Sequence, residues 1–105
     1  ISTYKGDNTP VGGFYSKKEK FKERTYTLQE IDLQENDWVF MYSDGFYDQF
    51  GGPKNKSMGS TRFKNILQDS VNKNKLSSVD FKNYFFDWKG KQEQIDDVLL
   101  IGFSL

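Results

Sequence analysis

The chain has 105 residues, enough for one small domain, and its 15 Lys and Arg residues balance 15 Asp and Glu residues to a formal net charge of zero. This balance offers no one-sided basic surface for nucleic acid. The absence of Cys and His excludes disulfides, cysteine nucleophiles, Ser-His-Asp catalysis and zinc sites built on thiolate or imidazole.

The first third of the chain is predicted to form a loop followed by one strand. Residues 5–13 are rich in turn formers, and the charged residues 17–22 are typical of a solvated turn or strand end. Residues 24–29 are β-branched or aromatic in part, with Tyr26 and Leu28 on one face. This pattern indicates a half-buried strand.

Two apolar runs predict strands that are buried on both faces. Residues 38–42 are apolar at every position and follow a turn at residues 34–37, and the second run covers residues 98–105. Between them, residues 50–59 contain Gly and Pro at bends, which favours a flexible connection.

Two amphipathic helices are expected after this connection. The first begins where Ser60 or Thr61 can cap free amide groups, and the second begins with Ser77 and Asp80 as a capping box and ends at Gly90. The apolar stripe of the first helix is Phe63, Ile66, Leu67 and Val71. The apolar stripe of the second helix is Phe81, Tyr84, Phe85 and Trp88. Because such stripes face a sheet, the predicted fold class is α+β, with a mostly antiparallel β-sheet and two helices packed on it.

Acidic residues stand at the ends of both predicted buried strands. Asp44 follows the first strand and precedes Gly45, which would let the chain turn sharply, and Asp96 and Asp97 precede the last strand. Strand ends hold carboxylates firmly, and hard divalent ions take oxygen ligands. Asp-Gly is also an ordinary turn dipeptide and Asp-Asp an ordinary loop ending, so the spacing alone favours turns over metal ligands.

The amino-acid sequences of these segments resemble those of a known family. Residues 38–51 read Trp-Val-Phe-Met-Tyr-Ser-Asp-Gly-Phe-Tyr-Asp-Gln-Phe-Gly, and residues 94–103 read Gln-Ile-Asp-Asp-Val-Leu-Leu-Ile-Gly-Phe. Together with Thr-Pro-Val-Gly-Gly at residues 9–13, they resemble the PPM family of metal-dependent protein phosphatases, in its SpoIIE-like, type-2C branch. The order and spacing of the segments carry the resemblance, which covers nearly the whole chain.

The resemblance implies a metal site that holds two Mn²⁺ or Mg²⁺ ions. Asp44 would bridge or ligate the paired ions, Gly45 belongs to the same motif and shapes its turn, and Asp96 would ligate one ion. Asp97 would lie beside these ligands. Asp48 matches a position where some members hold an additional, weaker ion, and a helix-start or turn carboxylate is an equally good interpretation of it.

The activity implied by the resemblance is hydrolysis of phosphoserine or phosphothreonine in proteins by a metal-activated water, without a covalent enzyme intermediate or a catalytic side chain. The expected setting is a bacterial signalling protein in the cytoplasm, either free or as the cytoplasmic part of a membrane-bound sensor. No apolar run approaches the roughly twenty residues that span a bilayer, and no signal peptide opens the chain. No membrane contact or nucleic-acid partner is therefore expected.

The chain departs from the family at one point. Family members carry an earlier motif, Asp-Gly-x-Gly or Asp-x-x-Gly-His-Gly, which has no counterpart before Asp44. We therefore expect residues 1–105 to be the C-terminal portion of a phosphatase domain with a PPM-type αββα sandwich. Such a portion would bind divalent ions weakly, lack activity alone and self-associate through exposed sheet faces or edges.

Two alternatives remain at this point. A catalytically inactive PPM-fold module that binds a partner protein would also lack the earlier motif. An unrelated α+β domain with coincidental turns would place Asp44 and Asp96 far apart.

Overall fold

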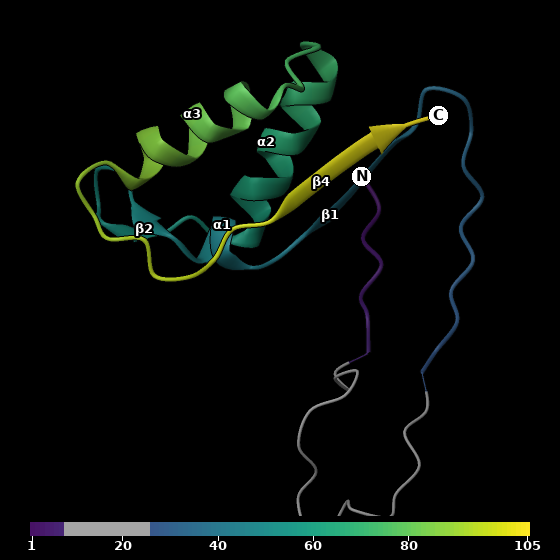
Figure 1. Cartoon of the computed structure of the whole chain (residues 1–105), viewed down its shortest axis with the longest axis horizontal. Helices are drawn as coiled ribbons and strands as arrows, with labels where there is room; N and C mark the ends of the chain where they lie inside the picture. Colours follow the sequence, from purple (N-terminus) through teal and green to yellow (C-terminus); the bar gives the residue numbers. More distant parts are fainter. Residues whose placement is uncertain (8–25) are drawn as a thin grey trace, which may run out of the picture. The chain divides into compact units, whose positions relative to one another are not determined.

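The computed structural model describes residues 1–7 and 26–105, which form two compact units, Ile1–Asp32 and Leu33–Leu105 (Figure 1). In the first unit, the Gln29 side chain donates a hydrogen bond to the Lys5 carbonyl at 2.7 Å, and the Thr27 N–H donates to the Asp7 carboxylate. These bonds involve side chains, and none of the described residues of this unit lies in a strand.

The prediction of a strand at residues 24–29 is therefore wrong for residues 26–29, the part of it that the structure describes. Tyr26 and Leu28 are exposed, so they do not form the half-buried face that the pattern predicted. The predicted turn at residues 17–22, the motif at residues 9–13 and most of the predicted loop at residues 5–13 lie outside the described residues.

The second unit contains the helices and strands of the described chain. Their order is β1 (Trp38–Tyr42), α1 (Gly45–Asp48), β2 (Phe50–Gly51), β3 (Lys56–Ser57), α2 (Ser60–Asn72), α3 (Ser78–Lys89) and β4 (Leu100–Ser104). β1 pairs with β4 and β2 pairs with β3, both antiparallel. The α+β class with antiparallel sheets is thus confirmed.

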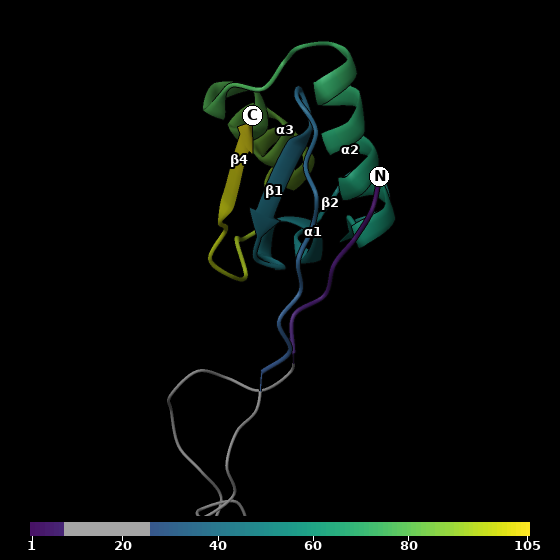
Figure 2. The ribbon, with the colours of Figure 1, turned by 90° about the vertical axis from the view of Figure 1, so that its right-hand side faces the viewer.

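Within the described residues of the second unit, helices cover one face of the β1–β4 sheet (Figure 2). Phe40, Tyr42 and Leu100 pack against the buried core, while Met41 and Ile101, which pair across the sheet, are 56% and 44% exposed. Successive side chains of a strand point to opposite faces, so the alternate residues remain exposed where nothing covers the second face. The prediction that both apolar runs are buried on both faces is therefore wrong for the described residues.

The two long helices begin in different ways. Ser77 and Asp80 form the predicted capping box, and α3 ends at Gly90, whose φ is +54°. In α2, the N-cap is Gly59, with φ of +84° and no side-chain cap, and Ser60 lies inside the helix. The predicted Ser60 or Thr61 cap is thus wrong, because the glycine makes the entry bend one residue earlier. None of the helices in the described residues is long and apolar enough to cross a bilayer.

The core lies where α1, α2 and α3 meet. Its buried residues are Phe46, Met58, Phe63, Leu67 and Phe85. The stripe predicted for α3 packs here, since Phe85 is buried and its other members are partly buried against the cluster. The segment at residues 50–59 is not the expected flexible connection: β2 and β3 form a hairpin within it, and the backbone N–H of Gly52 donates to the Trp88 carbonyl at 2.9 Å. This bond ties the hairpin to the end of α3.

Candidate metal centre

Pairing of β1 with β4 brings the two predicted acidic segments together. Tyr42, the last residue of β1, lies opposite Leu100, the first residue of β4, so the residue after β1 meets the residues before β4. The Ser43 N–H donates to the Leu99 carbonyl at 3.0 Å. The Ser43 hydroxyl accepts from the Leu99 N–H at 3.0 Å and donates to the Asp97 carbonyl at 3.2 Å. Ser43 therefore fastens the loop that carries the later aspartates to the end of β1.

Gly45 allows the closest approach between these segments. Asp44 is the N-cap of the short helix α1, and Gly45 is the first residue of that helix. A Cβ atom on Gly45 would lie 2.0 Å from the Asp97 carbonyl oxygen. The φ of Gly45 is not positive, so the backbone conformation does not require glycine here; a side chain is excluded because the Asp97 backbone occupies the space.

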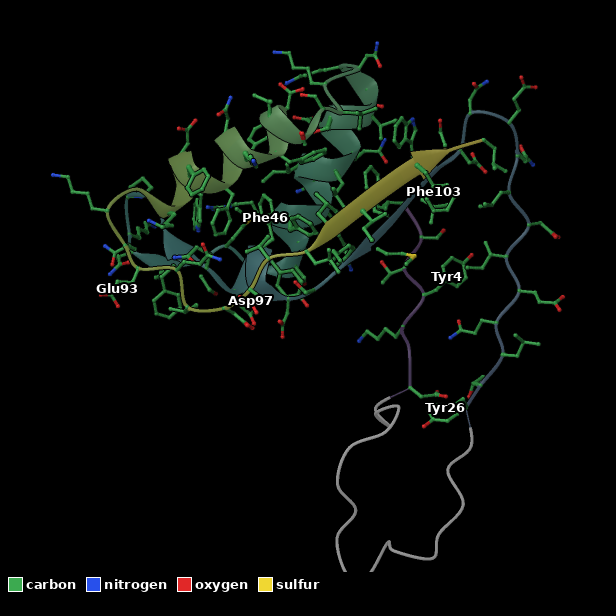
Figure 3. The ribbon with its side chains drawn as sticks, in the orientation of Figure 1. Tyr4, Tyr26, Phe46, Glu93, Asp97 and Phe103 are labelled. Carbon is green, nitrogen blue, oxygen red and sulfur yellow. The ribbon has the colours of Figure 1, made fainter. Side chains whose placement is uncertain are left out.

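Asp96 and Asp97 are exposed on the loop that leads into β4, and Figure 3 shows Asp97 beside α1. Asp97 contacts Ser43 and Gly45 through its backbone. Its own N–H donates to the Asp96 carboxylate at 2.8 Å. The structure thus places Ser43 and Gly45, on either side of Asp44, against the backbone of Asp97.

The negative charges of Asp44 and Asp48 both act on the pKa of the Tyr47 hydroxyl. Burial raises the pKa of the Tyr47 hydroxyl above its ordinary value of 10.0, and the negative charges of Asp44 and Asp48 raise it further, with a smaller contribution from Tyr42. Each effect disfavours the tyrosinate, because it is either desolvated or repelled. Both carboxylates therefore act on one hydroxyl at the edge of the core.

The raised pKa of Tyr47 predicts a loss of stability at alkaline pH. A pKa that is higher in the folded state contributes stability that is complete below pH 10.0 and is lost as the pH rises through the folded-state value. Urea unfolding measured on both sides of this range should show a falling free energy of unfolding, with a smaller fall in Tyr47→Phe. Ultraviolet difference titration should show that Asp44→Asn lowers the pKa of Tyr47, while Asp87→Asn on α3 leaves it unchanged. Equal tyrosine titration in Asp44→Asn and wild type would contradict the proximity of these groups.

The described residues do not complete a metal site. Within residues 1–7 and 26–105, no three His, Cys, Asp or Glu side chains lie close enough together to hold an ion. The aspartates expected to bind Mn²⁺ or Mg²⁺ therefore supply part of a coordination sphere at most.

Comparison with protein-family models, curated proteins and solved structures found no match to this chain. Assignment of a function therefore depends on the residues themselves and on their arrangement.

Two polar residues of this region were given no role from the sequence. The Ser43 hydroxyl donates a hydrogen bond to the Asp97 carbonyl in the loop before β4. Gln49 is fully buried and directly follows Asp48. Each is a polar residue next to apolar ones, which is the signal that could have singled it out. The partner of each lies more than forty residues away in the chain, at separations of 54 and 44, and the sequence alone does not identify it.

Proposed function

We propose that this chain is part of a metal-dependent phosphoserine and phosphothreonine protein phosphatase of the SpoIIE-like PPM type, in the cytoplasmic part of a bacterial signalling protein. The observation that supports the proposal is the β1–β4 pairing, which brings the Ser-Asp-Gly segment at Asp44 against the Asp-Asp segment at Asp96 and Asp97. These are the two segments on which the family resemblance depends, and they are far apart in the sequence.

Asp44 and Asp96 are proposed as ligands of Mn²⁺ or Mg²⁺, with Asp97 and Asp48 beside them. The chain would be the C-terminal portion of an αββα phosphatase domain, and further ligands would come from the portion before it. Activity is accordingly assigned to the full-length protein.

The proposal is tested by Mn²⁺-dependent hydrolysis of p-nitrophenyl phosphate and of a phosphoserine peptide by the full-length protein. Asp44→Asn and Asp96→Asn should each lower kcat/KM by about a hundredfold or more, because a metal contributes several kcal/mol of charge stabilisation in the transition state. Asp87→Asn, which changes an exposed carboxylate on α3, is the matched control and should retain activity. Unchanged activity in both site variants would refute their assignment as ligands.

A second candidate function is a catalytically inactive PPM-fold module that binds a partner protein. One observation favours it: Met41, Ile101 and Phe103 form an exposed apolar surface on one sheet. The full-length protein would then show no Mn²⁺- or Mg²⁺-dependent phosphatase activity and no Asp-x-x-Gly-His-Gly motif before this segment. Metal-dependent turnover in the wild type would exclude it.

A further inference from the structure

Gln49 is a fully buried polar residue that hydrogen-bonds to the loop carrying Asp96 and Asp97. It ends α1, directly after Asp48, and its relative exposure is 0%. Burying a side-chain amide costs free energy unless the amide is hydrogen-bonded. The hydrogen bonds of Gln49 therefore indicate its role in the fold.

The side chain of Gln49 reaches the loop that carries Asp96 and Asp97. Its amide nitrogen donates to the Glu93 carbonyl at 2.7 Å and to the Phe50 carbonyl at 3.0 Å. Glu93, labelled in Figure 3, lies on the stretch between the end of α3 and Asp96. Gln49 and Ser43 both hydrogen-bond to this loop through their side chains, Gln49 at Glu93 and Ser43 at Asp97 and Leu99.

The orientation of the Gln49 amide follows from these partners. Both are carbonyl oxygens, which only accept, so the nitrogen must face them and the Oε1 atom must face away. In the described part of the chain, this buried Oε1 has no hydrogen-bond partner. The described residues thus satisfy the amide nitrogen of Gln49 and leave its oxygen without a partner.

The backbone of Gln49 is held from the opposite side. Its carbonyl accepts from the Trp88 indole N–H at 2.7 Å and from the Met58 N–H at 3.1 Å. Because α3 and the β2–β3 hairpin both fix this carbonyl, the side chain projects from a rigid position.

We propose that Gln49 is a positioning residue for the acidic loop: its amide holds Glu93 so that Asp96 and Asp97 lie against the Asp44–Gly45 segment. The consequence for metal binding rests on the function proposed above, whereas the consequence for the order of the loop does not.

The test compares Gln49→Met with wild type by hydrogen–deuterium exchange of the peptide covering residues 91–99, without metal. Met has a similar length but cannot donate, so the loop loses its contact at Glu93. Exchange of this peptide should become about tenfold faster, the factor expected for the loss of one buried hydrogen bond. Free Mn²⁺ measured by electron paramagnetic resonance should show a dissociation constant raised by about tenfold, as for other residues that orient ligands.

Two variants separate positioning from general stability. Gln68→Met makes the same chemical change on the exposed face of α2, where the amide bonds Asn72, and should change neither quantity. Trp88→Phe removes the indole bond to the Gln49 carbonyl but leaves the Gln49–Glu93 contact in place. It should lower the overall stability and leave the loop peptide within about twofold of wild type, relative to the exchange of α2 and α3.

A measurement on the unaltered chain covers the case in which Gln49→Met does not fold. By NMR, the side-chain NH₂ protons of Gln49 should exchange with solvent at least about tenfold more slowly than those of exposed Gln68. Equal exchange of the two amides, or a loop peptide in folded Gln49→Met that exchanges as in wild type, would overturn the positioning role. Faster loop exchange in a chain that binds no Mn²⁺ would support the positioning role and count against the proposed metal function alone.

Discussion

Phe63→Ala should unfold most of the second unit at room temperature, or leave it close to its unfolding midpoint. Phe63 has 0% exposure, and its ring centroid lies 4.8 Å from those of both Tyr42 and Phe46 and 5.9 Å from that of Tyr47. Truncating a buried Phe costs about 3–5 kcal/mol, whereas a small unit has only roughly 0.05–0.15 kcal/mol of stability per residue. The loss is therefore comparable with the whole stability of residues 33–105.

Circular dichroism during urea unfolding measures this effect, and Phe86→Ala is the matched control. Phe86 is 55% exposed on α3, with its ring against that of Phe85, so its truncation should cost no more than about 1 kcal/mol. Equal shifts of the unfolding midpoint in the two variants would show that Phe63 is not the centre of the core. The Phe63→Ala change should also disturb Tyr42 and Tyr47, whose rings contact Phe63 and which lie next to the acidic segments in the chain.

Local sequence signals predicted the elements whose causes are local. The apolar run at residues 38–42 coincides with β1, and the capping box at Ser77 and Asp80 begins α3 as expected. The apolar run at residues 98–105 contains the shorter strand β4. In each case neighbouring residues provide both the pattern and its physical cause.

Two features that depend on distant residues were not predicted from the local sequence pattern. Met41 and Ile101 are apolar but exposed, because what covers a sheet face is decided by how the helices pack and not by the strand itself. Gln49 is a polar core residue whose partner, the Glu93 carbonyl, is contributed by another part of the chain. The neighbourhood of Asp44 and Asp97 was expected from the family resemblance, while spacing alone favoured ordinary turns.

Gly45→Ala should displace the acidic loop although alanine is the better helix former. The gain in helix propensity is about 1 kcal/mol at most, and α1 spans only Gly45–Asp48. Against it, the new Cβ would lie 2.0 Å from the Asp97 carbonyl oxygen and 2.8 Å from its carbonyl carbon, where ordinary contact begins at 3.4 Å. These are backbone atoms, so the whole loop must move. Overpacking of this kind costs about 1–3 kcal/mol or more, and the clash should prevail.

Hydrogen–deuterium exchange at the Leu99 amide reports the displacement directly, because this N–H donates to the Ser43 hydroxyl beside the clash. Gly51→Ala is the matched control: its Cβ would lie 1.9 Å from the Trp88 carbonyl oxygen, an equally severe clash at the β2–α3 contact. Both variants should lose stability in urea, but only Gly45→Ala should release the Leu99 amide and weaken Mn²⁺ binding. Gly6→Ala, which meets no atom within 4 Å, should be neutral. A Gly45→Ala chain with wild-type stability and a protected Leu99 amide would contradict the close approach of Gly45 to Asp97. The metal site proposed at this junction would then lose its main structural support.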